Sequence, residues 1–326
     1  MRSFRKWLKI IWLKVTLVFW AISAHAAQEP LKIGYSDWPG WVAWEIALEK
    51  AWFEEAGVSV DFEWFDYVAS MDAFAAGQLD AVCMTNGDTL VTGATGRRAQ
   101  MILINDFSNG NDMIVARPGI EDVSQLKGKT VGVEIGFVGH LLLLRALEQA
   151  GMAEEDINLI NVPTNETPSV LASGDVDAIV AWQPNSSQAL RLAPGAKAIY
   201  SSANEAGLIY DVLGVAPESL AARREEWGKV VDVWYRVVDF LENPDTRSEG
   251  LAIMASRVGI PAADYARFFA GTKILSKEEA ASRFTHSESL LSLWGSSKVA
   301  DAFNVKYSVY QPQQEIDGYI DGGFYQ

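Results

Sequence analysis

The feature that most constrains the fold is a βαβαβ pattern that occurs twice along the chain. In the first unit, segment 33–36 is followed, 43 residues after its glycine, by the segment 77–82. In the second unit, segment 131–134 is followed, 42 residues after its glycine, by the segment 174–179. Each unit runs strand, helix, strand, short helix and then a strand that begins Gly-x-x-Asp-Ala. The repeat predicts an α/β protein with two lobes built on the same plan.

The turns that follow these strands carry polar and aromatic residues. In the first unit the turn 36–41 contains Asp37 and Trp38, and in the second unit the corresponding turns are 134–139 and 182–185. Ligands bind at the carboxyl ends of strands in open α/β sheets. Two sheets whose strand ends face each other would form a cleft, so we expect the ligand between the lobes. The alternative for Asp37 is a helix cap.

The rest of the chain supplies further elements and the connections between the lobes. Alternating residues predict a strand over 58–65, and shorter apolar runs predict strands over 79–84, 101–104 and 113–116, with a polar loop over 105–112. The crossings between lobes are expected at 114–117 and 211–216. Everything from Pro217 onward is predicted to be helical and to pack on the first lobe. Its core aromatic residues are expected to be Trp227, Trp234, Tyr235, Phe240, Phe268, Phe269 and Trp294.

The first 26 residues have the pattern of a secretory signal peptide. Residues 1–14 contain five basic side chains and no acid, 15–22 are apolar, and Ala24-His25-Ala26 offers a cleavage site. The alternative is an uncleaved anchor. Lipidation is not expected, because no cysteine stands at the cleavage point. The predicted division of the chain is a signal peptide 1–26, a first part of lobe 1 at 27–115, lobe 2 at 116–212, and a return to lobe 1 with C-terminal helices at 213–326.

The charge balance limits the partners of the exported chain. Removal of 1–26 would take five of the 27 Lys and Arg and none of the 42 Asp and Glu. Such an excess of acid argues against nucleic acid and anionic membrane surfaces as partners, and we expect a monomer. The single cysteine, Cys83, excludes an internal disulfide.

Several short motifs, in this order and spacing, resemble periplasmic substrate-binding proteins of ABC transporters. They are Ser36-Asp37-Trp38-Pro39-Gly40-Trp41, Ala75-Ala76-Gly77-Gln78-Leu79-Asp80-Ala81, Leu126-Lys127-Gly128-Lys129 and Ala181-Trp182-Gln183-Pro184. The chain is most similar to the nitrate, sulfonate and taurine branch. The resemblance implies a two-lobed periplasmic-binding-protein type II fold that closes over a small molecule. It also implies a periplasmic location and delivery to an ABC permease with a cytoplasmic ATPase.

Within that branch, the Pro-Gly-Trp turn and Asn105-Asp106 resemble members associated with urea carboxylase, which implies guanidine or urea as ligand. The charge of the strand-end loops points to a cation independently of any family. These loops contain eight acidic residues and no Lys or Arg, with His140 the one nearby residue that could become positive. Unpaired buried carboxylates repel one another, and a cationic ligand would relieve that repulsion. The acidic loop residues are Asp37, Asp66, Asp88, Asp106, Asp112, Glu134, Glu166 and Asp211.

The predicted ligand-binding residues are Asp37, Trp38, Asp66, Thr85, Asp88, Glu134, Trp182 and Asp211. Guanidinium matches such a set, because it presents paired N–H donors to carboxylates and stacks on indole rings. The acids could instead be helix caps, and Trp41 is interpreted as core.

We expect no catalytic residues, metal or cofactor. The sequence has no Gly-x-Ser-x-Gly, His-Glu-x-x-His or P-loop motif, no clustered His or Cys for zinc, and no calcium loop. Two alternatives remain open. One is a small anion, such as an alkyl sulfonate or nitrate, as the ligand. The other is a ligand-sensing module that passes on a signal and does not deliver cargo.

Overall fold

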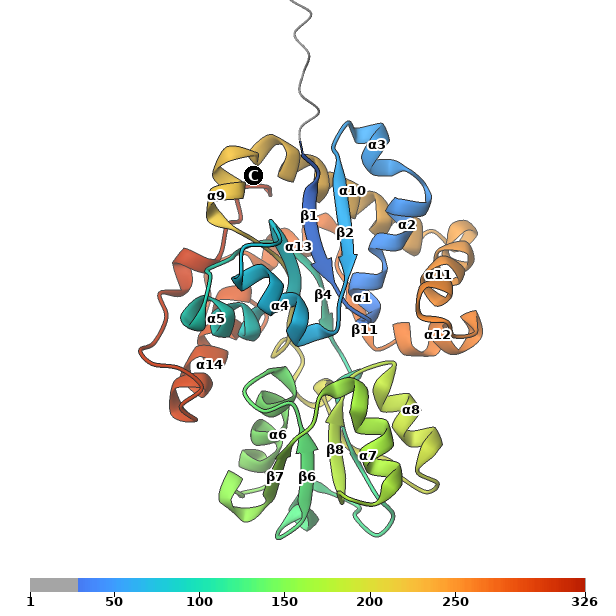
Figure 1. The fold of residues 1–326 in the computed structure, drawn as a ribbon, viewed down its shortest axis with the longest axis vertical. Helices are drawn as coiled ribbons and strands as arrows, with labels where there is room; N and C mark the ends of the chain where they lie inside the picture. The colour runs from blue at the N-terminus through green and yellow to red at the C-terminus, as the bar shows by residue number, and fades with distance from the viewer. Residues whose placement is uncertain (1–28, 326) are drawn as a thin grey trace, which may run out of the picture.

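The computed structural model describes residues 29–325, which form two lobes, one above the other in Figure 1. The candidate signal peptide lies outside the described residues. Each lobe is built around one β-sheet, and the chain passes between the two sheets twice. No helix in the described part of the chain is long and apolar enough to cross a membrane.

The first lobe contains a six-stranded sheet in the order β11-β4-β10-β3-β1-β2. Strands β1, β2 and β3 are parallel, whereas β10 runs antiparallel to both β3 and β4. The strands are β1 (Leu31–Tyr35), β2 (Val60–Trp64), β3 (Ala81–Thr85), β4 (Gln100–Ser108), β10 (Tyr210–Val215) and β11 (Thr272–Ile274).

The second lobe contains a five-stranded sheet in the order β7-β6-β8-β5-β9. Strand β6 is parallel to β7 and β8, and β5 runs antiparallel to β8 and β9. The arrangement β7-β6-β8 followed by an antiparallel strand repeats β2-β1-β3-β10 of the first lobe, as the internal repeat predicts. The strands are β5 (Met113–Ala116), β6 (Thr130–Val133), β7 (Asn158–Asn161), β8 (Ala178–Ala181) and β9 (Lys197–Ser201).

The chain crosses between the sheets at 109–112 and 202–209. The sequence predicted the crossings a few residues later, at 114–117 and 211–216. A local pattern indicates that a segment is a strand, but not which of the two sheets the strand joins. Strand β5 pairs wholly within the second sheet and β10 wholly within the first. The two crossings touch: the Ser108 and Ser202 hydroxyl oxygens are 2.7 Å apart and share a hydrogen bond.

Helices cover both sheets. Those of the first lobe are α1 (Pro39–Val42), α2 (Trp44–Glu49), α3 (Trp52–Ala56), α4 (Tyr67–Ala75), α5 (Asn86–Thr95), α9 (Pro217–Ala222), α10 (Arg224–Glu242), α11 (Pro244–Val258), α12 (Ala262–Phe269), α13 (Lys277–Arg283) and α14 (Leu293–Lys306). Those of the second lobe are α6 (Val138–Gln149), α7 (Thr167–Ser173) and α8 (Asn185–Leu192). Short 3-10 turns occur at Val123–Leu126, Glu154–Asp156, Thr164–Glu166, Ser202–Glu205 and Ile316–Tyr319.

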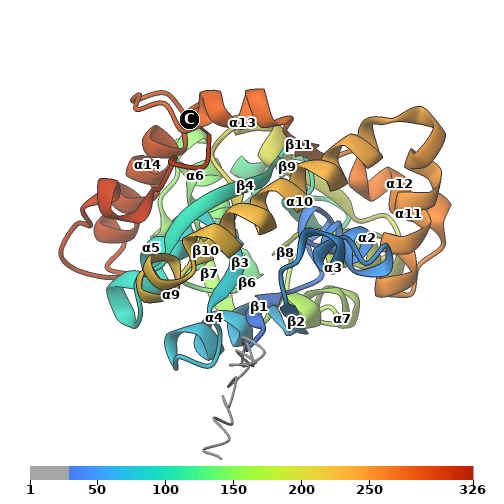
Figure 2. The same ribbon diagram turned by 90° about the horizontal axis from the view of Figure 1, so that it is seen from above.

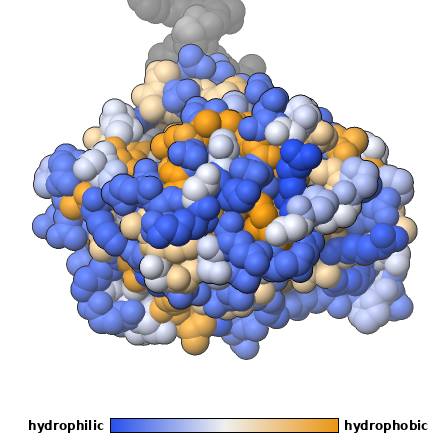
Figure 3. Space-filling model, turned by 90° about the horizontal axis from the view of Figure 1, so that it is seen from below, coloured by the Kyte–Doolittle hydropathy of each residue, from blue (hydrophilic) through white to orange (hydrophobic). Residues whose placement is uncertain are grey.

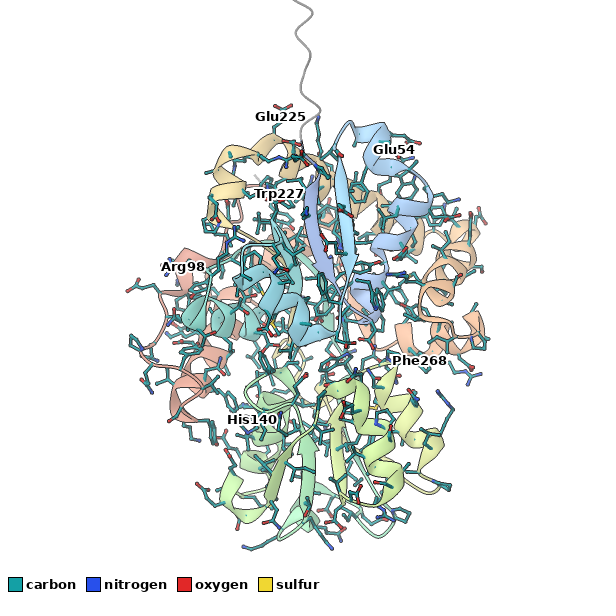
Figure 4. All side chains as sticks on the ribbon, in the orientation of Figure 1. Glu54, Arg98, His140, Glu225, Trp227 and Phe268 are labelled. Carbon is teal, nitrogen blue, oxygen red and sulfur yellow. The ribbon has the colours of Figure 1, made fainter. Side chains whose placement is uncertain are left out.

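The C-terminal helices pack on the first lobe, as expected. Helix α10 lies across the first sheet in the view from above (Figure 2) and buries Trp227 and Trp234 completely. The Trp234 ring lies 4.7 Å from that of Trp44 on α2. Most of the aromatic residues predicted for this core are buried, but Phe240 and Trp294 are only partly covered. Figure 4 shows Trp227 within the first lobe.

Two sequence expectations about local structure are wrong. Residues 105–108 belong to β4 and not to a loop, because β10 pairs with them and aligns Asp211 with Asp106. The region after Pro217 is not entirely helical, since β11 adds a three-residue strand to the edge of the first sheet. Both elements are stabilised by strand pairing between distant segments, which local sequence patterns do not reveal.

Candidate functional site

Two cavities lie between the lobes, where the strand ends of the two sheets face each other. We call the inner one the chamber. It has about 10 Å³ of space for the centre of a water-sized sphere, which is room for about one water molecule. Its lining comes from both lobes and from the first crossing: Trp38, Trp41, Tyr67, Thr85, Asp112, Val138, Trp182 and Asp211.

The outer cavity, here the vestibule, measures about 440 Å³ and opens to solvent. Its acidic lining residues are Asp37, Asp66, Glu134 and Glu166. Tyr67 and Trp182 line both cavities, so these two side chains separate the chamber from the vestibule. Their rings meet edge to face with centroids 5.3 Å apart.

Aromatic rings form most of the chamber wall. Trp41 stacks on Tyr67 with centroids 5.4 Å apart and an interplanar angle of 22°. Trp38 packs against Trp41 at 6.3 Å. All three tryptophans of the lining are buried. Trp38 directly precedes α1, Trp41 lies on α1, and Trp182 directly follows β8, so all three stand just after the ends of strands.

Carboxylates supply the polar part of the chamber. Asp211 lies on β10 and Asp112 lies on the first crossing, and both are buried. One oxygen of each carboxyl, Oδ2, is buried without a hydrogen-bond partner among the described residues. Buried polar atoms are nearly always hydrogen-bonded in proteins, so these two acceptors call for donors from a molecule in the chamber.

A second layer of acids supports the lining. The Tyr67 hydroxyl donates to Asp88 Oδ2 at 2.6 Å and accepts from the Thr85 backbone N–H at 3.0 Å. The Asp88 backbone N–H donates in turn to Thr85 Oγ1, which caps helix α5. Asp88 is therefore one layer behind the chamber, and Tyr67 connects it to the wall.

Asp106 forms the other part of this second layer, beside Asp211 in the β4–β10 pair. Trp38 Nε1 donates to its two carboxyl oxygens at 3.1 and 3.2 Å. The close approach depends on Gly40, because a Cβ at that position would lie 1.7 Å from Asp106 Oδ2. Helix α1 can therefore start directly against the carboxyl group.

Burial raises the pKa of every acid in this cluster. The pKa of Asp88 rises to about 6, that of Asp112 to about 7 and that of Asp106 to about 8. For Asp211 the pKa rises well above its usual range, first through burial and then through the negative charges of Asp106 and Asp112. No Lys or Arg in the described chain lines either cavity. The site therefore holds carboxyl groups without the positive charge that would let them all ionise.

Asp37 and Glu134 belong to the vestibule. Asp37 accepts hydrogen bonds from Trp182 Nε1 at 3.3 Å and from Asn185 Nδ2 at 3.0 Å. Glu134 accepts a hydrogen bond from Thr164 Oγ1 at 3.2 Å, and burial raises its pKa to about 7. His140, shown in Figure 4, lines neither cavity, and burial lowers its pKa to about 4. It supplies no positive charge there at neutral pH.

The predicted site residues therefore fall into three places. Trp38, Thr85, Trp182 and Asp211 line the chamber, Asp88 lies behind it, and Asp37, Asp66 and Glu134 line the vestibule. Trp41, which the sequence assigned to the core, is buried but also lines the chamber.

Two chamber residues, Tyr67 and Asp112, were not in the predicted site. Tyr67 directly follows Asp66 at a strand end, a position that could have marked it. Asp112 was named only among the acidic loop residues, and nothing local distinguishes it. No group of His, Cys, Asp and Glu in the described residues has the arrangement of a metal site.

Comparison with known proteins shows the same architecture. A family model described as the NMT1-like family matches residues 24–255. A protein of Brucella abortus (strain 2308), named as a binding protein, is 32% identical over 174 residues, which are 53% of this chain and 54% of that protein. The chain thus spans about half the length of that relative. A protein of Escherichia coli (strain K12), named for binding aliphatic sulfonates, is 25% identical over 249 residues, 74% of this chain and 76% of that protein.

The crystal structure of the periplasmic aliphatic sulphonate binding protein from Escherichia coli is similar with a TM-score of 0.74. The sequence identity is 21%, and the alignment covers 91% of this chain and 99% of that one. The predicted two-lobed periplasmic-binding-protein fold is thereby confirmed.

Proposed function

The chain belongs to the NMT1-like family, and on that premise we propose that it is the extracytoplasmic solute-binding component of an ABC importer, with guanidinium as its ligand. The observation that carries the choice of ligand is the pair of partnerless carboxylate oxygens, Asp112 Oδ2 and Asp211 Oδ2, in a chamber that no basic side chain lines. In their ionised form the two oxygens require N–H or O–H donors. A cation would favour that form over the protonated one that burial favours in the empty chamber.

Guanidinium matches the chamber in charge and in its pattern of donors, but it is larger than the single water molecule for which the chamber has room, so the chamber must widen to admit it. It has four non-hydrogen atoms, remains protonated at physiological pH, and carries only donors, which are arranged in a plane. The carboxylates would accept from its edges, and the rings of Trp38, Trp41 and Tyr67 would contact its faces. A longer substituted guanidine would have to extend past Tyr67 and Trp182 into the vestibule.

Two other ligands compete with guanidinium. Urea has a similar shape but is neutral and carries a carbonyl acceptor, which the carboxyl groups of the chamber could meet only in their protonated form. A small anion such as an alkyl sulfonate is the ligand named for the Escherichia coli relative. The chamber lining offers no basic side chain to bind an anion, and any ionised carboxyl group there would repel it.

The biological setting follows from the same premise. We propose that the protein acts in the periplasm as a monomer and delivers its ligand to a membrane permease coupled to a cytoplasmic ATPase. A gene neighbourhood with urea carboxylase would agree with a guanidine or urea ligand. A sensor of the same ligand would bind in the same way, and co-purification with a permease or with a membrane kinase would separate these two roles.

Thermal unfolding of the purified protein with a small panel of ligands tests the proposal. The panel is guanidinium at millimolar and lower concentrations, methylguanidine, urea, taurine and nitrate. A ligand that binds only the folded state adds about 2.7 kcal/mol to the free energy of unfolding at a hundredfold excess over its Kd. We expect guanidinium to raise the midpoint most. A rise of the midpoint with taurine or nitrate alone would reject the proposal that the ligand is a cation. A rise with urea alone would show that binding does not require a positive charge.

Variants of the two unpartnered acids make the test specific. Asp112→Asn and Asp211→Asn keep the size of the side chain but remove the negative charge, so we expect each to weaken guanidinium binding about ten- to a hundredfold. Asp72→Asn makes the same charge change at an exposed position on α4 and serves as the control. Equal effects of all three variants would mean that overall charge, and not contact, determines binding.

A further inference from the structure

Asp37 contacts the second lobe, although it belongs to the first. It follows β1 directly, and its carboxylate accepts hydrogen bonds from Trp182 and Asn185, which follow β8 in the other sheet. Asp37 lines the vestibule but not the chamber. The carboxylate therefore bridges the lobes from outside the space that we assign to the ligand.

Trp182 is the residue that this bridge holds in place. Its ring lies between chamber and vestibule and meets Tyr67 of the first lobe edge to face at 5.3 Å. Because both side chains line both cavities, a movement of Trp182 or Tyr67 would open a path between them. Tyr67 is fixed from behind by Asp88 and Thr85, whereas the indole N–H of Trp182 is bonded to Asp37.

We infer that Asp37 is a positioning residue: it fastens Trp182 over the chamber when the lobes close and so slows the escape of the ligand. The inference rests on the proposed function, because it assumes a ligand enclosed between the lobes. The sequence suggested that Asp37 contacts the ligand, whereas this inference assigns it the positioning of Trp182. The two hydrogen bonds join residues of different lobes, so separation of the lobes would break both, and they act on dissociation more than on the first encounter.

The geometry explains why an acid occupies this position. An amide at position 37 would present one oxygen, whereas the carboxylate offers one oxygen to Trp182 and the other to Asn185. On the flank of the molecule, Lys306 at the end of α14 and Tyr307 just after it also donate to Glu148 of α6. That second contact between lobes is more exposed, and exposed ion pairs contribute little.

Stopped-flow measurement of tryptophan fluorescence with guanidinium tests the inference. We expect Asp37→Ala and Asn185→Ala each to raise the dissociation rate about tenfold while the association rate changes less than about twofold. Neither substitution alters the chamber lining. Trp182→Phe keeps an aromatic ring at the wall but removes the indole donor, so it should also raise the dissociation rate. Asp72→Asn is the control for charge.

The double variant Asp37→Ala/Asn185→Ala separates the two roles of Asp37. If Asp37 acts through Asn185 and Trp182, the double variant should dissociate far more slowly than the product of the two single effects predicts. If Asp37 contacts the ligand, its removal should weaken binding by the full factor in the Asn185→Ala background too. That result would overturn the inference but leave the proposed function intact.

A distance measurement reports closure itself. The described residues contain one cysteine, Cys83, which is buried, so spin labels can be attached selectively to Gln78→Cys in the first lobe and Ser169→Cys in the second. In the ligand-saturated protein, Asp37→Ala should broaden the label distance toward an open population. An unchanged narrow distance would contradict the inference. If the original protein binds another member of the panel in place of guanidinium, the proposed function fails, and the same measurement with that molecule still decides the role of Asp37.

Discussion

At the scale of single residues, the buried acids of the cluster make stability depend on pH in an unusual direction. Most carboxylates in proteins stabilise the fold in their ionised form. Here burial raises the pKa of Asp88, Asp112 and Asp106 from 3.8 to about 6, 7 and 8. The folded state therefore binds more protons than the unfolded state between about pH 4 and pH 8, and stability falls as the pH rises through that window.

We expect the free energy of unfolding of the ligand-free protein to fall by on the order of 2 kcal/mol between pH 6.5 and pH 8.5. The lower limit avoids His140, which is buried with a pKa lowered to about 4 and so reduces stability below about pH 6.5. Urea denaturation at several pH values measures the trend, and Asp112→Asn should flatten it. A stability that rises over this range would contradict the assignment of these acids as protonated groups.

A cationic ligand should reverse the loss. Guanidinium keeps its charge across this range and favours the ionised carboxyl groups, so its stabilising effect should grow from pH 6.5 to pH 8.5. Neutral urea should show the opposite trend, because it needs protonated acids as donors. The ligand-induced shift of the unfolding midpoint at the two pH values checks this prediction. A guanidinium shift that does not change with pH would mean that the ligand displaces no protons.

At the scale of elements, helix α1 (Pro39–Val42) depends on a glycine for its place in the site. A Cβ on Gly40 would lie 1.7 Å from Asp106 Oδ2 and 3.0 Å from Trp38 Nε1. We expect Gly40→Ala to lower the free energy of unfolding by about 1–3 kcal/mol, because the carboxyl group is buried and cannot move away freely. It should also weaken ligand binding, since Trp38 would shift.

Gly228 on helix α10 (Arg224–Glu242) is the matched control for that substitution. A Cβ there would meet only Phe324, at an ordinary contact distance of 3.7 Å. Gly228→Ala should raise the free energy of unfolding by about 0.5–1 kcal/mol, because alanine is the better helix former. Denaturant unfolding of both variants measures the contrast. Equal effects would show that the α1–Asp106 approach is not close-packed in solution.

The elements also show how far the sequence alone could reach. Strand β5 begins and ends where its apolar run placed it, because apolar residues and flanking turns are local signals. The extension of β4 through Ser108 was missed. It exists because β10, about a hundred residues later, pairs with it and buries Asn105 and Asp106 completely. A local sequence pattern predicts a loop for a run of polar residues, even where those residues form a buried strand.

The same limit applied to the site. The strand-end turns drew attention to Trp38, Trp182 and Asp211, all of which line the chamber. Which acids face the chamber depends on small rotations of neighbouring turns. Asp37 points to the other lobe, Asp66 to the vestibule, and Asp112, which was not among the predicted ligand-binding residues, to the chamber. Spacing along the chain does not contain that information.

At the scale of the whole molecule, the excess of acid surrounds a cleft that is itself acidic. The chain has 42 acidic and 27 basic residues. Figure 3 shows a surface dominated by hydrophilic residues on the face seen from below. The vestibule carries Asp37, Asp66, Glu134 and Glu166 in front of the chamber. Such a field attracts cations to the cleft and repels anions before any contact is made.

This field predicts how binding kinetics respond to salt. The Debye length falls from about 30 Å at 0.01 M ionic strength to about 10 Å at 0.1 M, so the attraction of the vestibule for a cation should weaken across that range. We expect the association rate of guanidinium to fall severalfold and its dissociation rate to change little, because the chamber itself is buried. Trp38, Trp41 and Trp182 line the chamber and provide the fluorescence signal. An anionic ligand would show the reverse, with association accelerated by salt.

Glu166→Gln, at the rim of the vestibule, should reduce the salt dependence, whereas Asp72→Asn on α4 should leave it almost unchanged.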